Sequence, residues 1–250
     1  MPYSHPQPLE RHNAFKQVQF LLPGAVALAG SAGFINSVAL GFFNTPVSHM
    51  TGAISHFGMD AADNKWSDAF SAATIIVGFL FGAALNGIIV GAWKLVPGRH
   101  YGIAMIVEGG LLGIATLLFL EKHGLALPVV SMACGLQNAM SSSYCGLMIR
   151  TTHVTGIMTD IGVMLGHWIR HRQIEGWKLR FLMLIVGAFG TGCWLGQWTD
   201  ARLGPVCLAI PATGFIIAGT ALSYAYHRGL VDLMQSVSPV PPTTASFPKH

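Results

Sequence analysis

Charged residues are scarce in this sequence. Only 10% of its 250 residues are charged and 52% are hydrophobic, whereas a soluble globular domain carries about 25% charged residues. The scarcity of charge excludes an ordinary water-soluble domain. The net charge of +4 does not indicate a nucleic-acid partner, because the basic residues stand at the ends of apolar stretches rather than on one patch.

Several familiar chemical motifs are also missing. The sequence has no GxGxxG before a helix, no GxxxxGK(S/T), no HExxH and no GxSxG. Its cysteines all lie inside apolar runs without a CxxC pair, so we interpret them as small packing residues rather than disulfides or metal ligands. They are Cys134, Cys145, Cys193 and Cys207. We therefore expect no cofactor and no metal site.

What the chain has instead is long apolar stretches, and the lipid bilayer is its first expected partner. A spanning helix needs about 20 predominantly apolar residues. Six stretches meet this requirement, at residues 20–43, 69–93, 101–120, 125–147, 181–198 and 203–226. Segments 44–58 and 150–169 are less apolar and carry His, Thr and Asp. The sequence predicts an all-α polytopic transmembrane bundle with about six full spans and two short motif helices. Eight full spans is the alternative.

The distribution of basic residues predicts the orientation. With six spans and a cytoplasmic N-terminus, eleven of the fourteen Lys and Arg residues lie on the cytoplasmic side, leaving Lys65, Lys122 and Arg202 outside. Both termini are then cytoplasmic. Residues 1–15 and most of 229–250 are polar and rich in proline, so we expect disordered tails there. The charge bias weakens only a little with eight spans.

A short motif occurs twice. Residues 48–52 read Ser-His-Met-Thr-Gly, and residues 152–156 read Thr-His-Val-Thr-Gly. The stretches before them also match and place Asn36 opposite Asn138. We therefore predict two membrane repeats, at residues 16–122 and 123–228. Three spans per half is an odd number, so the second repeat should be inverted, as is common in transporters.

Each HxTG motif is predicted to form the N-terminal turn of a short helix. If the two segments enter the membrane from opposite faces, their N-termini meet near its middle, where free backbone N–H groups favour negative charge. A packing corner with a satisfied interior histidine is the other interpretation. The candidate substrate-binding residues are His49, Thr51, Gly52, Arg150, His153, Thr155, Gly156, Asp160, Glu108, Asn36 and Asn138.

Three charged residues add to this hypothesis. Glu108 lies in an apolar run, where a carboxylate is costly and marks a candidate functional site; alternatively it snorkels toward Arg99. Arg150 is the cation best placed to reach an anionic solute or to neutralise Asp160 or Glu108, unless it only anchors the helix at the membrane surface. The sequence predicts that Arg150, His153, Asp160, His49 and Glu108 converge on one buried polar site.

The motifs resemble the YoaK family of bacterial multi-pass membrane proteins, a family of unknown function. That family has a GF(V/I)(D/N)-type stretch leading to a VSHMTGN-like element, then a GxQNA stretch leading to R-T-T-x-x-T-G-x-x-T-D-x-G. Here these stand at residues 33–36, 47–52, 135–139 and 150–162, with Ala53 where the family often has Asn. The resemblance spans about residues 20–226. It implies a bacterial cytoplasmic membrane location and supplies no substrate or reaction.

Three hypotheses about function remain open at this point. The leading one is a small-solute transporter or channel with its pathway between the two HxTG motifs, and an anionic solute fits the helix N-termini. The others are a membrane enzyme or redox protein that uses the motif histidines, and a membrane scaffold without a pathway. Enzymatic activity is the less favoured reading. The solute, the coupling ion and homo-oligomerisation cannot be inferred from the sequence.

Overall fold

We describe the protein from a computed structural model, which describes residues 8–43, 47–90, 99–142, 153–172 and 174–228. The side chains of residues 8–21, 43, 99 and 142 are not described. These ranges contain eight α-helices, one 3₁₀ helix and no strand. In chain order they are α1 (Pro8–Phe43), α2 (Met50–Ala62), α3 (Trp66–Val90), α4 (Arg99–Leu120), α5 (Ala126–Ser142), α6 (Val154–His171), α7 (Gly176–Leu203), η1 (Gly204–Leu208) and α8 (Ala209–His227).

The predicted helical class is confirmed over these residues. Each of the six apolar stretches forms a helix, and both weaker segments contain a shorter one, α2 and α6. The main difference lies at the beginning, because α1 starts at Pro8, inside the segment expected to be a tail. Proline suits the first turn of a helix, where its missing N–H group has no intrahelical role.

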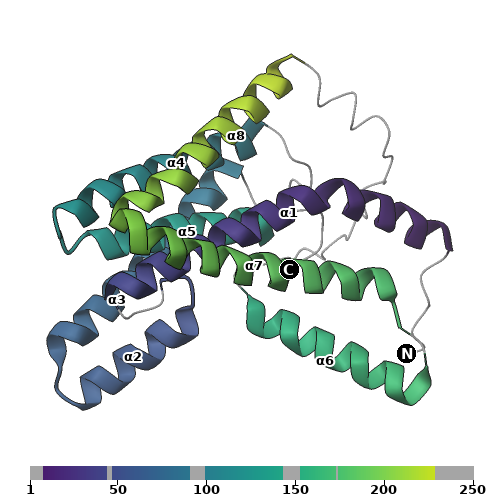
Figure 1. Ribbon diagram of the computed structural model, residues 1–250, viewed down its shortest axis with the longest axis horizontal. Helices are drawn as coiled ribbons and strands as arrows, with labels where there is room; N and C mark the ends of the chain where they lie inside the picture. Colours follow the sequence, from purple (N-terminus) through teal and green to yellow (C-terminus); the bar gives the residue numbers. More distant parts are fainter. Residues whose placement is uncertain (1–7, 44–46, 91–98, 143–152, 173, 229–250) are drawn as a thin grey trace, which may run out of the picture.

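Three antiparallel helix hairpins are visible in Figure 1: α2–α3, α4–α5 and α6–α7. Each tight turn includes a residue in the left-handed conformation, with φ of 60° at Asn64, 54° at Lys122 and 55° at Arg172. Such a residue ends a helix by turning the chain out of the helical path. The α2–α3 and α6–α7 hairpins extend to opposite sides of the molecule (Figure 1).

Helices α1 and α7 pack closely through glycines. A Cβ atom on Gly192 would collide with the carbonyl group of Gly30, and further along the pair a Cβ on Gly41 would lie 3.2 Å from Gln197 Oε1. Residue numbers rise together along the two helices, so α1 and α7 run parallel. Small residues at helix contacts of this kind are typical of membrane bundles.

Helices α3 and α5 form a second parallel pair. A Cβ on Gly78 would collide with the carbonyl group of Pro128, and one on Gly82 with that of Met132. Residue numbers again rise together along the two helices, so α3 and α5 run parallel.

Helices α4 and α8 form an antiparallel pair. A Cβ on Gly102 would lie 2.6 Å from the carbonyl oxygen of Gly219, and one on Gly109 would lie 2.6 Å from that of Ala212. Here the residue number rises along α4 and falls along α8. Each of the three glycine-mediated contacts therefore fixes the relative direction of the two helices in its pair.

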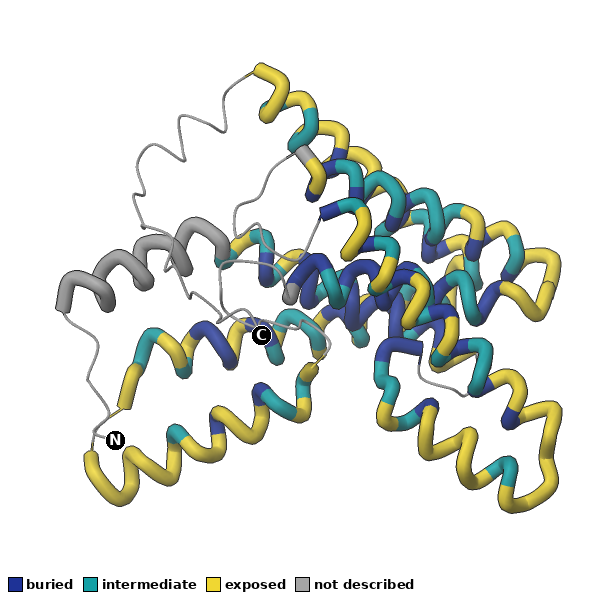
Figure 2. Tube along the Cα trace, turned by 180° about the vertical axis from the view of Figure 1, so that it is seen from behind, coloured by how far each residue is buried: buried dark blue, intermediate teal, exposed yellow. Residues whose placement is uncertain are grey.

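Buried residues concentrate where α1, α3, α4 and α5 meet, and the outer arms of the hairpins are mostly exposed (Figure 2). The principal core includes Ile35, Ile75, Leu112 and Leu136, all with an exposed fraction of 0%. A smaller core joins the middle of α1 to α6 and α7. The bundle is thus tightly packed at its centre.

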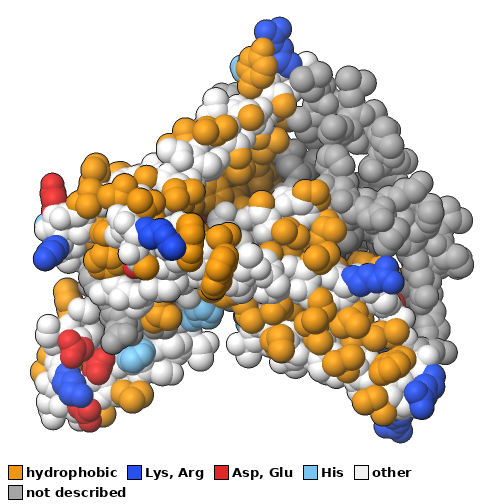
Figure 3. Space-filling model, viewed as in Figure 1, with side chains coloured by type: hydrophobic (Ala, Val, Ile, Leu, Met, Phe, Trp, Pro, Cys, Tyr) orange, Lys and Arg blue, Asp and Glu red, His pale blue; other side chains and the backbone are white. Residues whose placement is uncertain are grey.

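Most of the outward surface is apolar. Figure 3 shows hydrophobic side chains over most of this face, with the charged ones in a few small groups, several of them at the outer ends of the molecule. Four stretches of the described chain are long and apolar enough to cross a membrane: Leu22–Phe42, Trp66–Val90, His100–Leu120 and Gly176–His227. The last of these is 52 residues long and contains both α7 and α8. Large apolar residues exposed on such helices are those of a membrane protein, because lipid replaces water around them.

Candidate functional site

The two HxTG motifs begin α2 and α6 in the same way. His49 and His153 each stand immediately before the first helical residue, and neither side chain caps the helix. The first turn closes through a backbone bond of 3.2 Å in both, from Ala53 N to His49 O and from Ile157 N to His153 O. Both motifs therefore form N-terminal helical turns, as their sequence predicts.

The side chains one turn later also match. The Ser55 hydroxyl donates to the Thr51 carbonyl oxygen at 2.9 Å, and the Thr159 hydroxyl donates to that of Thr155 at 3.0 Å. Thr51 and Thr155 are both exposed, so their hydroxyl groups lie at the surface of the described chain. The two helix starts are equivalent in local structure.

The first motif is tied to α1 by a buried polar network. The Ser48 hydroxyl donates to Asn36 Oδ1 at 2.7 Å, and its oxygen lies 3.2 Å from His49 Nδ1. A hydroxyl has one proton, so a Ser48 hydroxyl that donates to Asn36 Oδ1 can at the same time only accept from the His49 ring. The tautomer with its proton on Nδ1 fits this arrangement and leaves Nε2 as an acceptor. The ring is half-buried and meets Phe189 of α7 edge-on, with 6.0 Å between the ring centroids.

Ser131 of α5 is a site residue that the sequence analysis missed. Its fully buried hydroxyl lies 3.2 Å from the Val47 carbonyl oxygen, just before the motif, and 2.8 Å from that of Ile75 in α3. It thereby links the first motif to the α3–α5 pair. The only sequence signal was an isolated hydroxyl in an apolar stretch, which alone does not distinguish a tether from a helix back-bond.

The second motif is more open. His153 is exposed, and its ring lies over Gly156, where a Cβ atom would collide with the imidazole. A larger residue at position 156 would therefore displace the exposed His153 ring from this position. Asp160, two turns further along α6, is exposed. Arg150 lies outside the described residues.

Glu108 has a different environment. It is completely buried in α4, and neither carboxyl oxygen has a hydrogen-bond partner among the described residues. Cys134 of α5 is close enough to interact with it electrostatically. One turn along α5, buried Gln137 donates from Nε2 to the Leu28 carbonyl oxygen at 2.8 Å, while its Oε1 is also unpaired in the described part of the chain.

The predicted convergence on one polar site is only partly addressed by these contacts. Described hydrogen bonds join Asn36 to His49 through Ser48. Those of the described residues do not join His49 to Glu108 or to Asp160. Asn138 is half-buried and makes an interaction of its own. Because Arg150 is not described, the five-residue site stays a prediction. Within the described ranges, no three His, Cys, Asp or Glu side chains are grouped to hold a metal.

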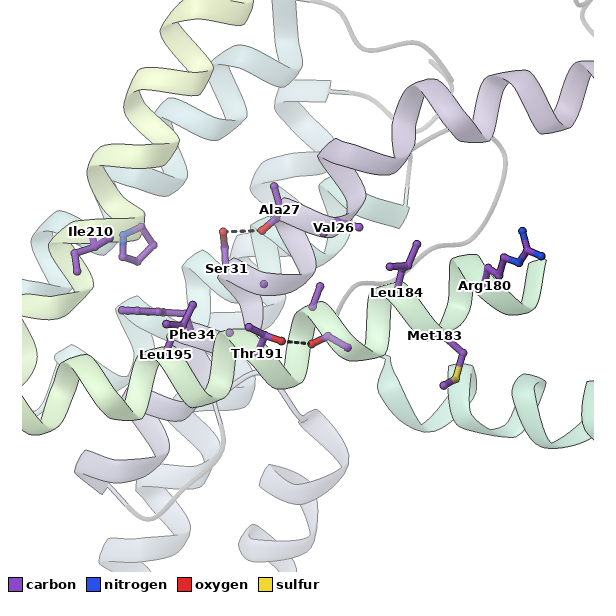
Figure 4. Close-up of a pocket in the computed structure, with 15 residues that line it drawn as sticks. Val26, Ala27, Ser31, Phe34, Arg180, Met183, Leu184, Thr191, Leu195 and Ile210 are labelled. Atoms are coloured by element: carbon purple, nitrogen blue, oxygen red, sulfur yellow. Dashed lines mark hydrogen bonds between the residues drawn. The ribbon is translucent and has the colours of Figure 1, made fainter. Parts of the chain in front are cut away.

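A groove of about 950 Å³ lies between α1, α7 and the start of α8 (Figure 4). The Ser31 and Thr191 hydroxyls that line it are each bonded to their own helix, at 2.8 Å to the carbonyl oxygens of Ala27 and Gly187. Arg180, at one end, is the one charged residue among the described residues that line it. None of the predicted site residues lines the groove, and its apolar walls suit a lipid chain better than a polar solute.

Comparison with known proteins places the chain in a family. A family model described as "Protein of unknown function (DUF1275)" matches residues 24–221, which is most of the chain and includes both HxTG motifs. No curated protein and no solved structure matches it. The repeated motif and most of each apolar helix lie within the matched region, and the chain is a membrane protein that belongs to the DUF1275 family of unknown function.

Proposed function

We propose that this protein is a small-solute transporter or channel whose pathway runs between its two HxTG helix starts. The observation that carries the proposal is the equivalence of these helix starts, one in each half of the chain, in backbone and side-chain bonding. Duplicated polar elements in an apolar repeat are typical of transporters, whose sites lie between the repeats. Free N–H groups at the two helix starts favour an anionic group on the solute.

We further propose that the two halves are inverted repeats. A Cβ on Gly33 of α1 would collide with the Phe189 carbonyl of α7, and one on the matching Gly135 of α5 would collide with the Phe79 carbonyl of α3. Helix α1 belongs to the first half and packs on α7 of the second half. In the same way, α5 belongs to the second half and packs on α3 of the first half. A two-fold axis between the halves requires this exchange.

The α4–α8 pair supports the same axis. Gly109 packs on Ala212 and Ile216, and Gly219 packs on Gly102 and Ile106. The contacts are reciprocal. A two-fold rotation that places α4 on α8 and α8 on α4 would produce this pattern. Two helices related in this way by a membrane-plane axis are antiparallel, which agrees with the direction of this pair.

The helix directions favour six spans over eight. If α2 and α6 do not cross, successive spans alternate so that α1 is parallel to α7, α3 is parallel to α5, and α4 is antiparallel to α8. All three relations match the packing of the pairs. If α2 and α6 also crossed, α4 and α8 would have the same direction. The proposed topology therefore has α1, α3, α4, α5, α7 and α8 as spans.

Charges at the hairpin tips support a cytoplasmic N-terminus. The α2–α3 turn carries Asp60, Asp63 and Asp68 against one Lys65. The α6–α7 turn is basic, with Arg170, Arg172, Lys178 and Arg180. These tips lie at opposite sides of the molecule (Figures 1 and 3). Under the positive-inside rule, the α6–α7 turn faces the cytoplasm.

Uptake into proteoliposomes tests the proposal. The full chain is reconstituted and assayed with labelled phosphate, sulfate, succinate and an amino acid. We expect saturable uptake of at least one of these, and a loss of about tenfold or more in the His49→Ala, His153→Ala double variant, which corresponds to about 1.4 kcal/mol of binding. His167→Ala, His171→Ala is the matched control, because these exposed histidines of α6 lie outside the motif. Equal loss in both variants, or no uptake of any solute, would contradict the proposal.

The Asn36–Ser48–His49 network gives the enzyme hypothesis a specific form. It orients one histidine with Nε2 as an available base, which suits general-base chemistry. An enzyme built on this network should depend on His49 much more than on exposed His153. A transporter with a pathway between the motifs should depend on both, so the two single variants distinguish the classes.

A further inference from the structure

The Glu108 carboxyl group has an environment that the proposed pathway between the motifs does not explain. It lies in the middle of α4 with an exposed fraction of 0%, and both of its oxygens lack a hydrogen-bond partner in the described part of the chain. Complete burial also means that, in this structure, it does not reach the surface by snorkelling. A carboxylate in such a position is costly, because the membrane interior does not solvate its charge.

No described cation compensates this group. The helices packed on α4 are α3, α5 and α8, together with η1. Cys134 on α5 is the titratable residue that interacts with Glu108. The other titratable residues described on these elements are either exposed near a helix end or part of η1. They are Asp68, Tyr224, Tyr226 and His227 at helix ends, and Cys207 in η1. The stable form of Glu108 in this setting is therefore the neutral acid.

A helix that packs on α4 carries another buried acceptor without a partner in the described part of the chain. Gln137 Oε1 is buried without a partner one turn along α5 from Cys134. Carboxyl and amide oxygens that lack donors are suited to a proton or a metal cation. A metal ion needs several oxygen ligands and room for them, at least six for a calcium-like ion, whereas a proton needs neither. The close packing around Glu108 favours the proton.

The repeat relation isolates Glu108 further. The reciprocal α4–α8 contacts match Gly109 with Gly219, so the position matching Glu108 is Ala218. The acid thus occurs in one half only, whereas the HxTG helix start occurs in both. The duplicated HxTG helix start is expected of a pathway that both halves line. An acid present in one half is expected of a single site that couples proton movement to transport.

We propose that Glu108 is a proton-binding site that couples proton movement to solute transport. Its carboxylate binds one proton from water on one side of the membrane to form the neutral acid, and releases that proton to the other side after the helices rearrange. No bond other than the O–H bond forms or breaks, and no oxidant or reductant is involved. This inference rests on the proposed transport function.

Labelling with the hydrophobic reagent dicyclohexylcarbodiimide tests the site without a transport assay. The reagent adds to a neutral carboxylic acid, with no leaving group, and raises the peptide mass by one reagent molecule. In membranes containing the full chain, we expect labelling at Glu108 that decreases as the pH rises, and none at this position in Glu108→Gln. Exposed Glu121, at the end of the same hairpin, serves as the internal control and should react with a water-soluble carbodiimide instead.

The outcomes separate the two proposals. Absence of label at Glu108 at every pH, or labelling that is independent of pH, would overturn the proton site. Glu108→Gln mimics the neutral acid, so it should retain the elution profile and thermal stability of the wild type; a large loss of stability would instead indicate a structural role. If Glu108 is labelled but no solute is taken up, the proton site stands and the transport proposal fails. If uptake occurs and Glu108→Gln still responds fully to a pH gradient, the coupling role is wrong.

Discussion

The Ser48 hydroxyl connects two residues that belong to different sequence elements. It donates to Asn36 on α1 and lies against the ring of His49 at the start of α2. Ser48 and Asn36 are nearly fully buried, with exposed fractions of 4% and 5%. One hydroxyl therefore ties the start of the first motif to α1 and contacts the Nδ1 side of the His49 ring. We infer that Ser48 acts as a positioning residue.

Replacing Ser48 by alanine should destabilise the protein by about 1–3 kcal/mol, because the buried Asn36 oxygen loses its donor. Unfolding in detergent, followed by circular dichroism, measures this change. Ser55→Ala is the matched control: its hydroxyl bonds to an exposed helix carbonyl, and we expect a change within about 0.5 kcal/mol. Equal stability of the two variants would show that the Ser48–Asn36 hydrogen bond does not contribute to the free energy of unfolding.

At this scale the sequence predicts residue identities better than their environments. Asn36 and His49 were selected from the repeat, and they are joined. The same repeat treats His49 and His153 as equals, yet His49 is half-buried and His153 is exposed. Burial depends on which helix packs nearby, and the motif alone does not contain that information. Ser131 was missed for the same reason, because its acceptors are far away in sequence.

At the scale of helices, apolar length was a sufficient guide to position. Where the structure describes them, the six apolar stretches are mainly helical, and the HxTG motifs begin α2 and α6. Boundaries were less accurate, since α1 extends from Pro8 through Pro23 without ending. Proline removes one backbone donor, and this is tolerated in membrane helices because neighbouring groups satisfy the freed carbonyl. The packing partners of the helices could not be predicted, since apolar side chains do not specify which helix they face.

Glycine substitutions test the pairing of the helices directly. Gly82 in α3 and Gly192 in α7 each face a backbone carbonyl that a Cβ would strike, whereas Gly87 in α3 and Gly190 in α7 have open space. We expect Gly82→Ala and Gly192→Ala to destabilise the protein by about 1–3 kcal/mol through overpacking. Gly87→Ala and Gly190→Ala should be neutral or stabilising, because alanine is the better helix former.

Thermal unfolding of the four variants in detergent measures these effects. The repeat relation adds a second expectation: Gly82→Ala and Gly192→Ala should cost similar free energies, since their contacts correspond in the two halves. If Gly87→Ala, which has open space, destabilises the protein as much as Gly82→Ala, the loss does not come from the contact with α5. That result would contradict the packing described for α3 and α5.

At the scale of the whole molecule, charge and packing constrain different features. Charge alone predicts the cytoplasmic N-terminus but barely distinguishes six spans from eight. The antiparallel contact of α4 with α8 is the observation on which the proposed six-span topology rests, because eight spans would give these helices one direction. The two topologies also differ at one accessible place. With six spans the α2–α3 turn is outside, and with eight spans it is inside.

Cysteine labelling at this turn separates the two topologies. In a background without the native cysteines, Ser67→Cys, at the exposed start of α3, should react with a membrane-impermeant maleimide in intact cells. Glu175→Cys, exposed at the start of α7, should react only after the cells are permeabilised, since both topologies place it in the cytoplasm. Its protection in intact cells is therefore the internal control for membrane integrity. Protection of Ser67→Cys as well would place the α2–α3 turn in the cytoplasm. The three-span halves would then be lost, and with them the inverted repeat on which the proposed pathway depends.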